Sequence, residues 1–243
     1  MPELSLKKAR KLAQCAASGM GRRGLRNGVG LGVEHLEMLS GVPVETLIDV
    51  GANRGQFSLA TRKAHPECRV HAFEPLEDEA ETYRRVFAGQ AGVTLYGCAL
   101  GSEAGETVIN VTKRKDSSSL LPVSDRQTEI FPGTEKASER VIQIARLDDI
   151  VPAEDCAGQT LLKIDVQGFE LEVLKGAAGL LRQIDHVYVE CSFVELYSGQ
   201  PLQDEVKAYL EAQGFQHDRV FNQEHDADGA PVQADFLFKR APA

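Results

Sequence analysis

The chain has 243 residues, of which 42% are hydrophobic and 26% are charged, and its formal net charge is −9. A charge this negative argues against a nucleic-acid-binding protein, because affinity for phosphate depends on clustered lysine and arginine. No apolar run approaches the ~20 residues that cross a bilayer, so the composition indicates a soluble globular protein that acts on a small or neutral molecule.

The first 43 residues form a basic segment, which we expect to be a helical arm beside a main domain at 44–243. Its positive charges meet almost no acidic residues and are Lys7, Lys8, Arg10, Lys11, Arg22, Arg23 and Arg26. A solvated helix and loop packed beside the main domain is the favoured interpretation, and contact with an anionic partner is the alternative. Because no apolar segment like that of a signal peptide follows these charges, we expect a cytoplasmic protein.

The five cysteines are scattered and include no Cys-x-x-Cys pair. Widely spaced cysteines in odd number are typical of reduced, packed thiols rather than of a disulfide scaffold or a zinc site. We therefore expect no disulfide framework.

The first part of the main domain alternates between strand and helix patterns. A short apolar run predicts a strand at 44–50, and the residues after the glycines predict a helix at 57–63. A second strand at 69–74, a helix at 76–87 and a third strand at 93–96 follow. This β-α-β-α-β order is typical of a parallel sheet with helices on its faces.

The middle of the chain departs from that alternation, in an insertion that we place at about 101–146. A glycine-bounded turn leads into a strand pattern at 106–112, and a second strand pattern appears at 140–144. A hairpin fits these residues better than a crossover helix does. The polar loop between them, at 113–138, is either a flexible insertion or a substrate lid.

The alternation returns in the last third of the chain. Strands are predicted at 160–166, 186–190, 215–221 and 234–238, with helices at 169–182, broken near Gly176, and at 201–213. The whole pattern predicts an α/β, doubly wound, seven-stranded, mostly parallel sheet with an antiparallel C-terminal strand.

The stretch "LIDVGANRGQF" at 47–57 lies where an open α/β sheet binds its ligand, at the end of the first strand. Gly51 and Gly55 carry no Cβ, so we expect a ligand to approach the backbone there. The spacing lacks the middle glycine of a dinucleotide fingerprint, because Asn53 stands in its place. Asp49 would repel a phosphate and suits a ligand with an ammonium group.

Glu74 is the last residue of the second predicted strand. A carboxylate at that position can accept hydrogen bonds from the hydroxyls of a ribose. A nucleoside with an amino-acid tail and no pyrophosphate would satisfy Asp49, the glycines and Glu74 together. S-adenosylmethionine is such a molecule.

The sequence resembles the FkbM family of Rossmann-like, S-adenosylmethionine-dependent methyltransferases, from about residue 44 to 238. The motifs that carry the resemblance are "IDVGANRGQFS" at 48–58, "AFEP" at 72–75, "ALG" at 99–101, "SSSL" at 117–120, "RLDDIV" at 146–151 and "LLKIDVQGFELEVLKGA" at 161–177. The last of these is the most specific. The resemblance implies methyl transfer to a hydroxyl, commonly on a sugar or a polyketide-like natural product. We expect the acceptor to be a sugar, a glycoconjugate or a glycosylated natural product.

On the pattern of this family, Asp49, Gly51, Asn53 and Gly55 would line the methionine end of the cofactor. Glu74 would hold the ribose, and Cys98 and Ala99 would lie near the adenine. The resemblance adds the remaining cofactor-binding candidates, which are Phe57, Pro75, Ser119 and Asp165. The chain departs from the family at Cys98, where many methyltransferases have a polar residue, and at Gln167, where many members have Glu.

Three residues at the ends of the strands at 160–166 and 186–190 are the catalytic candidates. Strand alternation places Lys163 and Asp165 on one face, and we predict that Asp165 is the general base, positioned by Lys163. Glu190 would orient the acceptor or serve as a second base. A purely structural Lys163–Asp165 ion pair is the alternative, as is a Mg²⁺ ion shared by Asp165 and Glu190.

Two other functions remain open at this point. An NAD-dependent oxidoreductase would use the same fold, although the missing glycine and Asp49 disfavour it. A non-catalytic binding module would keep the fold without the activity, although it need not keep Asp49, Gly51, Glu74 and Asp165 in register. The acceptor and the oligomeric state do not follow from the sequence.

Overall fold

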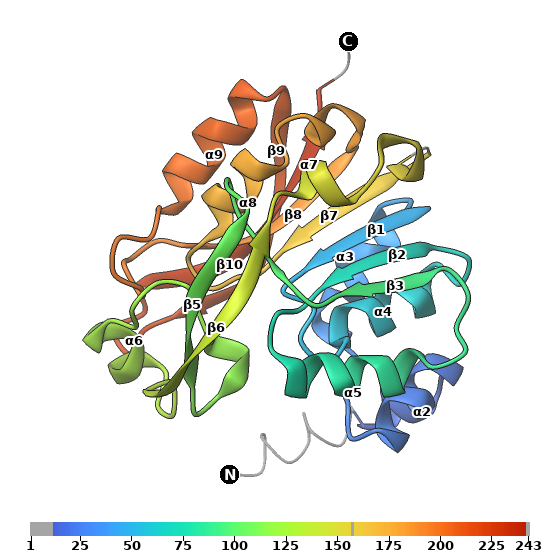
Figure 1. Cartoon of the computed structure of the whole chain (residues 1–243), viewed down its shortest axis with the longest axis horizontal. Coiled ribbons are helices and arrows are strands. Elements are labelled where there is room, and N and C mark those ends of the chain that lie inside the picture. The colour runs from blue at the N-terminus through green and yellow to red at the C-terminus, as the bar shows by residue number, and fades with distance from the viewer. Residues whose placement is uncertain (1–11, 157, 242–243) are drawn as a thin grey trace.

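The computed structural model describes residues 12–156 and 158–241, and its centre is a seven-stranded sheet (Figure 1). The strand order is β3-β2-β1-β7-β8-β10-β9. Their bounds are β1 Thr46–Val50, β2 Arg69–Phe73, β3 Val93–Tyr96, β7 Thr160–Ile164, β8 His186–Ser192, β9 Phe215–His225 and β10 Pro231–Arg240. The strands from β3 to β8 are parallel, and β10 runs antiparallel to both of its neighbours. The predicted fold class is confirmed.

Helices cover both faces of this sheet, because the side chains of its central strands alternate between two apolar layers. Ile48 and Val50 of β1 face one layer, whereas Leu47 faces the other. Figure 1 shows α8 and α9 on one side of the sheet and α4 and α5 on the other. The helices are α2 Gly19–Arg26, α3 Leu36–Gly41, α4 Gln56–Ala64, α5 Glu77–Phe87, α6 Asp125–Ile130, α7 Leu147–Ile150, α8 Glu170–Gly176 and α9 Gln203–Ala212, with short 3-10 turns η1 Val33–His35, η2 Lys115–Ser117, η3 Ala153–Cys156 and η4 Leu180–Gln183.

A second, three-stranded sheet stands beside the main one, in the order β4-β6-β5. Its strands are β4 Ala99–Leu100, β5 Gly105–Thr112 and β6 Lys136–Ala145. The antiparallel pairing of β5 with β6 confirms the predicted hairpin. The sequence patterns gave no indication of β4, nor of α6, which lies inside the segment expected to be loop.

The basic N-terminal segment contributes to the core where the structure describes it. Leu31, Met38 and Leu39 are fully buried in the same apolar layer as Leu59 of α4. The side chain of Arg23 donates hydrogen bonds to main-chain carbonyls at the end of α5. The other basic residues of the predicted arm, Lys7, Lys8, Arg10 and Lys11, lie outside the described residues.

All five cysteines are free thiols, and four of them are buried, as the sequence predicted. In the described ranges, no helix is both long and apolar enough to cross a membrane.

Candidate active site

The loop after β1 is shaped by close backbone packing. Gly51 has φ +75°, and a Cβ there would lie 1.9 Å from the carbonyl oxygen of Asp165. Gly55 has φ +94°, and a Cβ there would lie 2.6 Å from the ring of Phe87. These contacts give a second reason for glycine at both positions, beside the expected approach of a ligand to the backbone. The glycines let β7 and α5 approach the loop, because any side chain would meet main chain or an aromatic ring.

Glu74 holds the same loop from the end of β2. Its two carboxylate oxygens accept main-chain hydrogen bonds from Asn53 and Leu76, each at 2.8 Å. The side chain is buried, and burial raises its pKa to about 7, although the two amide donors oppose this shift. Each oxygen keeps a further lone pair that can accept from a ligand.

A row of polar side chains crosses the sheet on the face that α4 covers. Strand register pairs Asp49 of β1 with Lys163 of β7, and Lys163 with Tyr188 of β8. The register also pairs Glu190 of β8 with Asp235 of β10. Residues paired in register, and residues two apart in one strand, point to the same face of a sheet, so all these side chains lie on one face.

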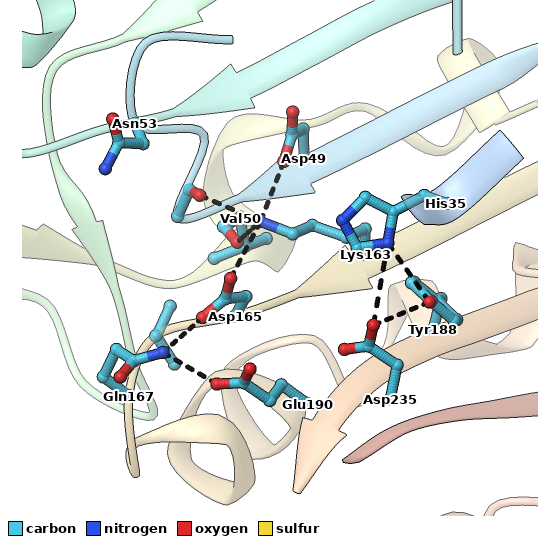
Figure 2. A network of polar contacts seen from close by, with 12 residues as sticks. His35, Asp49, Val50, Asn53, Lys163, Asp165, Gln167, Tyr188, Glu190 and Asp235 are labelled. Carbon is cyan, nitrogen blue, oxygen red and sulfur yellow. Dashed lines mark hydrogen bonds and ion pairs between the residues drawn. The ribbon is translucent and has the colours of Figure 1, made fainter. Parts of the chain in front are cut away.

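Asp49 and Lys163 form a buried ion pair beneath the loop (Figure 2). The Nζ of Lys163 lies 3.2 Å from Asp49 Oδ1 and donates to the carbonyls of Val50 and Gly51 at 3.2 and 2.9 Å. Burial opposes the charge, but Asp49 and Asp165 outweigh it and raise the pKa of Lys163. Lys163 thus remains an ammonium group that fixes the end of β1.

This pairing changes the expected role of Asp49, whereas the expected Lys163–Asp165 ion pair is present with a longer distance. Asp49 is fully buried, its Oδ2 accepts a hydrogen bond from Ser58 at 2.7 Å, and its side chain does not reach a ligand cavity. The closer acidic partner of Lys163 is Asp49, since Asp165 Oδ2 is 4.0 Å from the ammonium nitrogen. Asp49 therefore serves as the counter-charge of Lys163 rather than as a group that faces a ligand.

A first cavity of about 390 Å³ opens beyond the carboxyl ends of β1 and β2. The predicted residues that line it are Gly51, Asn53, Phe57, Glu74, Pro75, Cys98, Ala99, Ser119, Lys163 and Asp165. Asp49 and Gly55 are absent from this lining, for the reasons given above. The buried Oε1 of Gln56, which also lines the cavity, has no hydrogen-bond partner among the described residues.

A second cavity of about 630 Å³ adjoins the first, because the two share Glu34, His35, Asp116, Asp165 and Gln167 as lining residues. Glu190 lines the second cavity but not the first. Asp165 therefore lies in the wall that the two cavities share. Glu190 lies in the second cavity only, away from the loop after β1.

Gln167 joins the two carboxyl groups that the sequence singled out (Figure 2). Its Nε2 donates to Asp165 Oδ1 at 2.8 Å and to Glu190 Oε2 at 2.7 Å. Its Oε1 accepts from the hydroxyl of Tyr197 at 2.8 Å, and its φ of +59° is unusual for a residue with a side chain. Burial, followed by the charges of Asp165 and Asp235, raises the pKa of Glu190 well above its ordinary value.

His35 is a functional candidate that the sequence analysis missed. Its Nδ1 lies 3.2 Å from the Tyr188 hydroxyl and 3.6 Å from Asp235 Oδ2, and Tyr188 donates to the same carboxylate at 2.8 Å (Figure 2). Burial lowers the pKa of His35, although Asp235 acts in the opposite direction. A neutral imidazole beside both cavities can accept a proton. No local motif marks His35, which lies in the segment that we assigned to the arm.

The structure does not support the alternative of a Mg²⁺ site. The amide nitrogen of Gln167 stands between Asp165 and Glu190, where a shared cation would have to bind. Among residues 12–156 and 158–241, no cluster of three or more His, Cys, Asp or Glu side chains has the geometry to hold a metal ion.

A family model described as the methyltransferase FkbM domain matches residues 49–217, which include the loop after β1, Glu74, Lys163, Asp165 and Glu190. The chain belongs to the FkbM methyltransferase family. The resemblance drawn from the motifs is confirmed, and the chain is a methyltransferase rather than an oxidoreductase.

Relatives of this FkbM methyltransferase are distant but match most of its length. Methyltransferase sdnD of Sordaria araneosa is 29% identical over 70% of this chain and 73% of its own. The 31-O-demethyl-FK506 methyltransferase FkbM of Streptomyces tacrolimicus is 28% identical, over 71% and 73%. Hexuronic acid methyltransferase AglP of Haloferax volcanii is 30% identical, over 69% and 62%.

Proposed function

We propose that the chain transfers the methyl group of S-adenosylmethionine to a hydroxyl oxygen of a sugar, a glycoconjugate or a glycosylated small molecule. The observation that carries this proposal is the shared wall of the two cavities at Asp165. A methyl donor in the first cavity and an acceptor in the second would meet there. Such an arrangement provides the alignment that an in-line displacement requires.

The first cavity suits S-adenosylmethionine by the chemistry of its lining. Glu74 offers acceptor lone pairs for the ribose hydroxyls, and Cys98 and Ala99 offer a mainly apolar wall for the adenine. Gln56, which lines this cavity, replaces Asp49 as our candidate for holding the amino-acid tail. When bound, this cofactor supplies a methyl group on a positively charged sulfur.

Asp165 is the general base in this proposal. Its Oδ1 is fixed by Gln167, and its carboxylate lines both cavities. Asp165 would take the proton of the acceptor hydroxyl as that oxygen attacks, and the cofactor would supply the methyl group. Lys163 stays protonated and positions the loop, and Glu190 positions Gln167, because Glu190 Oε2 accepts a hydrogen bond from the Gln167 amide.

His35 is the second candidate for the base. It also lines both cavities, and Asp235 and Tyr188 hold its Nδ1 side, which leaves Nε2 to accept a proton. The two candidates differ in charge, because a neutral imidazole becomes cationic when it accepts the proton, whereas Asp165 becomes neutral.

A hydroxylated acceptor is supported by the polar lining of the second cavity, which includes Ser117, Gln127, Asn222 and Gln233. Such side chains provide the directional hydrogen bonds by which proteins orient hydroxyl groups. The names of two relatives point the same way, since one is an O-demethyl-FK506 methyltransferase and the other a hexuronic acid methyltransferase.

The first experiment is calorimetric titration of the full chain with S-adenosylmethionine, with NADH as a competitor. We expect micromolar binding of the former, which is lost in Glu74→Ala. Incubation with isotopically labelled S-adenosylmethionine and a panel of glycosides then shows by mass spectrometry whether a hydroxyl gains the label. Binding of NADH in preference to S-adenosylmethionine, or methylation confined to nitrogen, would refute the proposal.

A further inference from the structure

The hydroxyl of Tyr197 lies behind the wall that the two cavities share. The side chain is 1% exposed and lines neither cavity. Its hydroxyl is 2.8 Å from Gln167 Oε1 and 2.9 Å from the main-chain carbonyl oxygen of Ser117, and it accepts a hydrogen bond from Gln127 Nε2 at 3.3 Å. Burial raises the pKa of this hydroxyl, so it keeps its proton and acts as a donor to these oxygens. Tyr197 can therefore affect the cavities through its neighbours, but not by touching a ligand.

Gln167 depends on this hydroxyl, because the two ends of its amide have opposite needs (Figure 2). Nε2 uses its two N–H groups on Asp165 and Glu190, at 2.8 and 2.7 Å. Oε1 needs a donor, and the Tyr197 hydroxyl supplies one. Without that donor, the oxygen would face an aromatic ring and remain unsatisfied, which is costly. Because Gln167 lines both cavities, its amide would then turn toward solvent and leave Asp165.

The main chain at Gln167 is also held close to Tyr197. Its φ of +59° is strained for a residue with a side chain, and such strain persists where the surrounding contacts hold it. The Ser119 hydroxyl donates to the Gln167 carbonyl oxygen at 2.6 Å. The next residue, Gly168, packs so closely that a Cβ there would lie 3.3 Å from Tyr197 Cβ. The backbone and both ends of the amide are thus fixed beside the same ring.

We propose that Tyr197 is a positioning residue for methyl transfer, because its hydroxyl fixes the Gln167 amide that holds the carboxylate of Asp165. This inference rests on the proposed function, in which Asp165 is the general base. A base acts when its oxygen lies within hydrogen-bond reach of the proton that it removes. A carboxylate that loses the amide gains rotational freedom and spends less time in that position. Tyr197 should therefore affect turnover rather than the affinity for the cofactor.

The test is Tyr197→Phe, which removes the hydroxyl and keeps the ring in its apolar cluster with Leu196 and Val232. Turnover is measured with isotopically labelled S-adenosylmethionine and the glycosides that the chain methylates. We expect kcat to fall about tenfold and KM for S-adenosylmethionine to stay within about twofold. Tyr209→Phe is the matched control. It removes a hydroxyl that donates to the Leu174 carbonyl oxygen at 3.4 Å, and neither residue lines a cavity, so kcat should not change.

A double-mutant cycle separates positioning from a merely structural role. In a chain that carries Gln167→Leu, turnover should already be low. Tyr197→Phe should then lower it by less than about twofold more, because the hydroxyl has no amide left to orient. An effect that passed through Ser117 or Gln127 would persist undiminished in that background. Equal fold losses in the two backgrounds would therefore refute the proposal, as would an unchanged kcat in Tyr197→Phe alone.

NMR follows the Gln167 amide directly and needs no acceptor. In a chain with isotopically labelled glutamine, the side-chain resonances of Gln167 are assigned by their loss in Gln167→Leu. We expect hydrogen exchange of this amide to accelerate at least about tenfold in Tyr197→Phe and to stay unchanged in Tyr209→Phe. Exchange at the wild-type rate in Tyr197→Phe would refute the proposal. If no glycoside is methylated, the proposed function fails, and the exchange rates still decide whether Tyr197 fixes Gln167.

Discussion

The two cavities differ in how their charged groups are compensated. In the first, Glu74 accepts two main-chain amides and Asp49, beneath the loop, faces the ammonium group of Lys163. In the second, the carboxyl groups of Asp165, Glu190 and Asp235 stand near one another and receive hydrogen bonds from neutral side chains. In the first arrangement the donors are main-chain amides and an ammonium group, whereas in the second most of the donors are side-chain amides.

Under the proposed function, this difference corresponds to two tasks. A cavity for an invariant cofactor benefits from rigid, fully satisfied walls, because rigidity lowers the cost of ordering upon binding. A cavity for an acceptor determines specificity through groups that are satisfied only by the correct molecule. The substitutions below test two points. One is whether the buried ion pair and the close packing hold the loop of the first cavity in place, and the other is whether residues of the second cavity carry out the reaction.

Asp165→Asn should produce the largest effect, at the boundary of the two cavities. Because the amide cannot accept the hydroxyl proton, we expect turnover to fall by about 10³-fold, within the range for a general base. Affinity for S-adenosylmethionine should change by only a few fold. Single-turnover kinetics and calorimetry measure the two quantities. His35→Gln is the comparison variant, and a larger loss of turnover there would transfer the role of base to His35.

Asp49→Asn should be the most destabilising change beneath the first cavity. It leaves the Lys163 ammonium buried without its nearest counter-charge, which should cost about 3 kcal/mol of folding free energy. Chemical denaturation measures the change. The double variant Asp49→Leu/Lys163→Met removes both charges and should recover much of the loss, since the cost comes from the unpaired charge. If Asp49→Asn is as stable as the wild-type protein, the pair does not lock the loop.

Gly51→Ala should lower stability by at least about 2 kcal/mol, because it adds a collision with the carbonyl oxygen of Asp165, just after β7, to an unfavourable φ. Gly89→Ala is the matched control. Gly89 has a similar φ of +71°, but nothing lies within 4 Å of a Cβ there, so we expect about 1 kcal/mol. Comparing the thermal unfolding of the two variants separates the cost of the collision from the cost of the positive φ. Similar losses in the two would mean that the loop can move away from β7.

The smallest expected effect is a pH dependence of cofactor affinity. In the proposed complex the ribose hydroxyls would donate to the ionised form of Glu74, whose pKa is about 7 in the folded chain. Affinity for S-adenosylmethionine should therefore rise by up to about tenfold between roughly pH 6 and pH 8, and Glu74→Gln should remove the rise. A rise of the same size in the variant would assign the titration to another group.

The same carboxyl group should affect stability in the opposite direction. Its folded pKa is raised, so the folded chain binds the proton more tightly than the unfolded chain does. The resulting stabilisation is fully present below the unfolded pKa and is lost as the pH rises through about 7. Glu170 also has a pKa of about 7 for the same reason, but it lines neither cavity and should influence stability alone.

The first cavity was largely predictable because its walls come from consecutive strand-loop-helix units. Asn53 and Glu74 are 21 residues apart and meet through one hydrogen bond, as local strand order implies. The error at Asp49 arose from long-range register. The neighbour of Asp49 across the sheet is Lys163, and only the pairing of β1 with β7 brings them together. No pattern in either strand alone contains that information.

The second cavity was hardly predictable because its walls meet only in three dimensions. His35 and Asp235 are 3.6 Å apart but come from opposite ends of the chain. Helix α6 supplies Gln127 from a segment that we expected to be loop. Its one local signal is Ser124, whose hydroxyl caps the helix by accepting the amide hydrogen of Gln127.

The reactivity of one cysteine, Cys98, can report whether the first cavity is occupied. Cys98 is half-buried and lines the first cavity, whereas the other four cysteines are buried away from solvent. Burial raises the pKa of the Cys98 thiol, so alkylation should be slow and should accelerate in alkaline solution. A molecule seated in the cavity would shield this sulfur from a small electrophile. The extent of alkylation at each cysteine peptide of the wild-type chain can thus show binding in this cavity, without any introduced label.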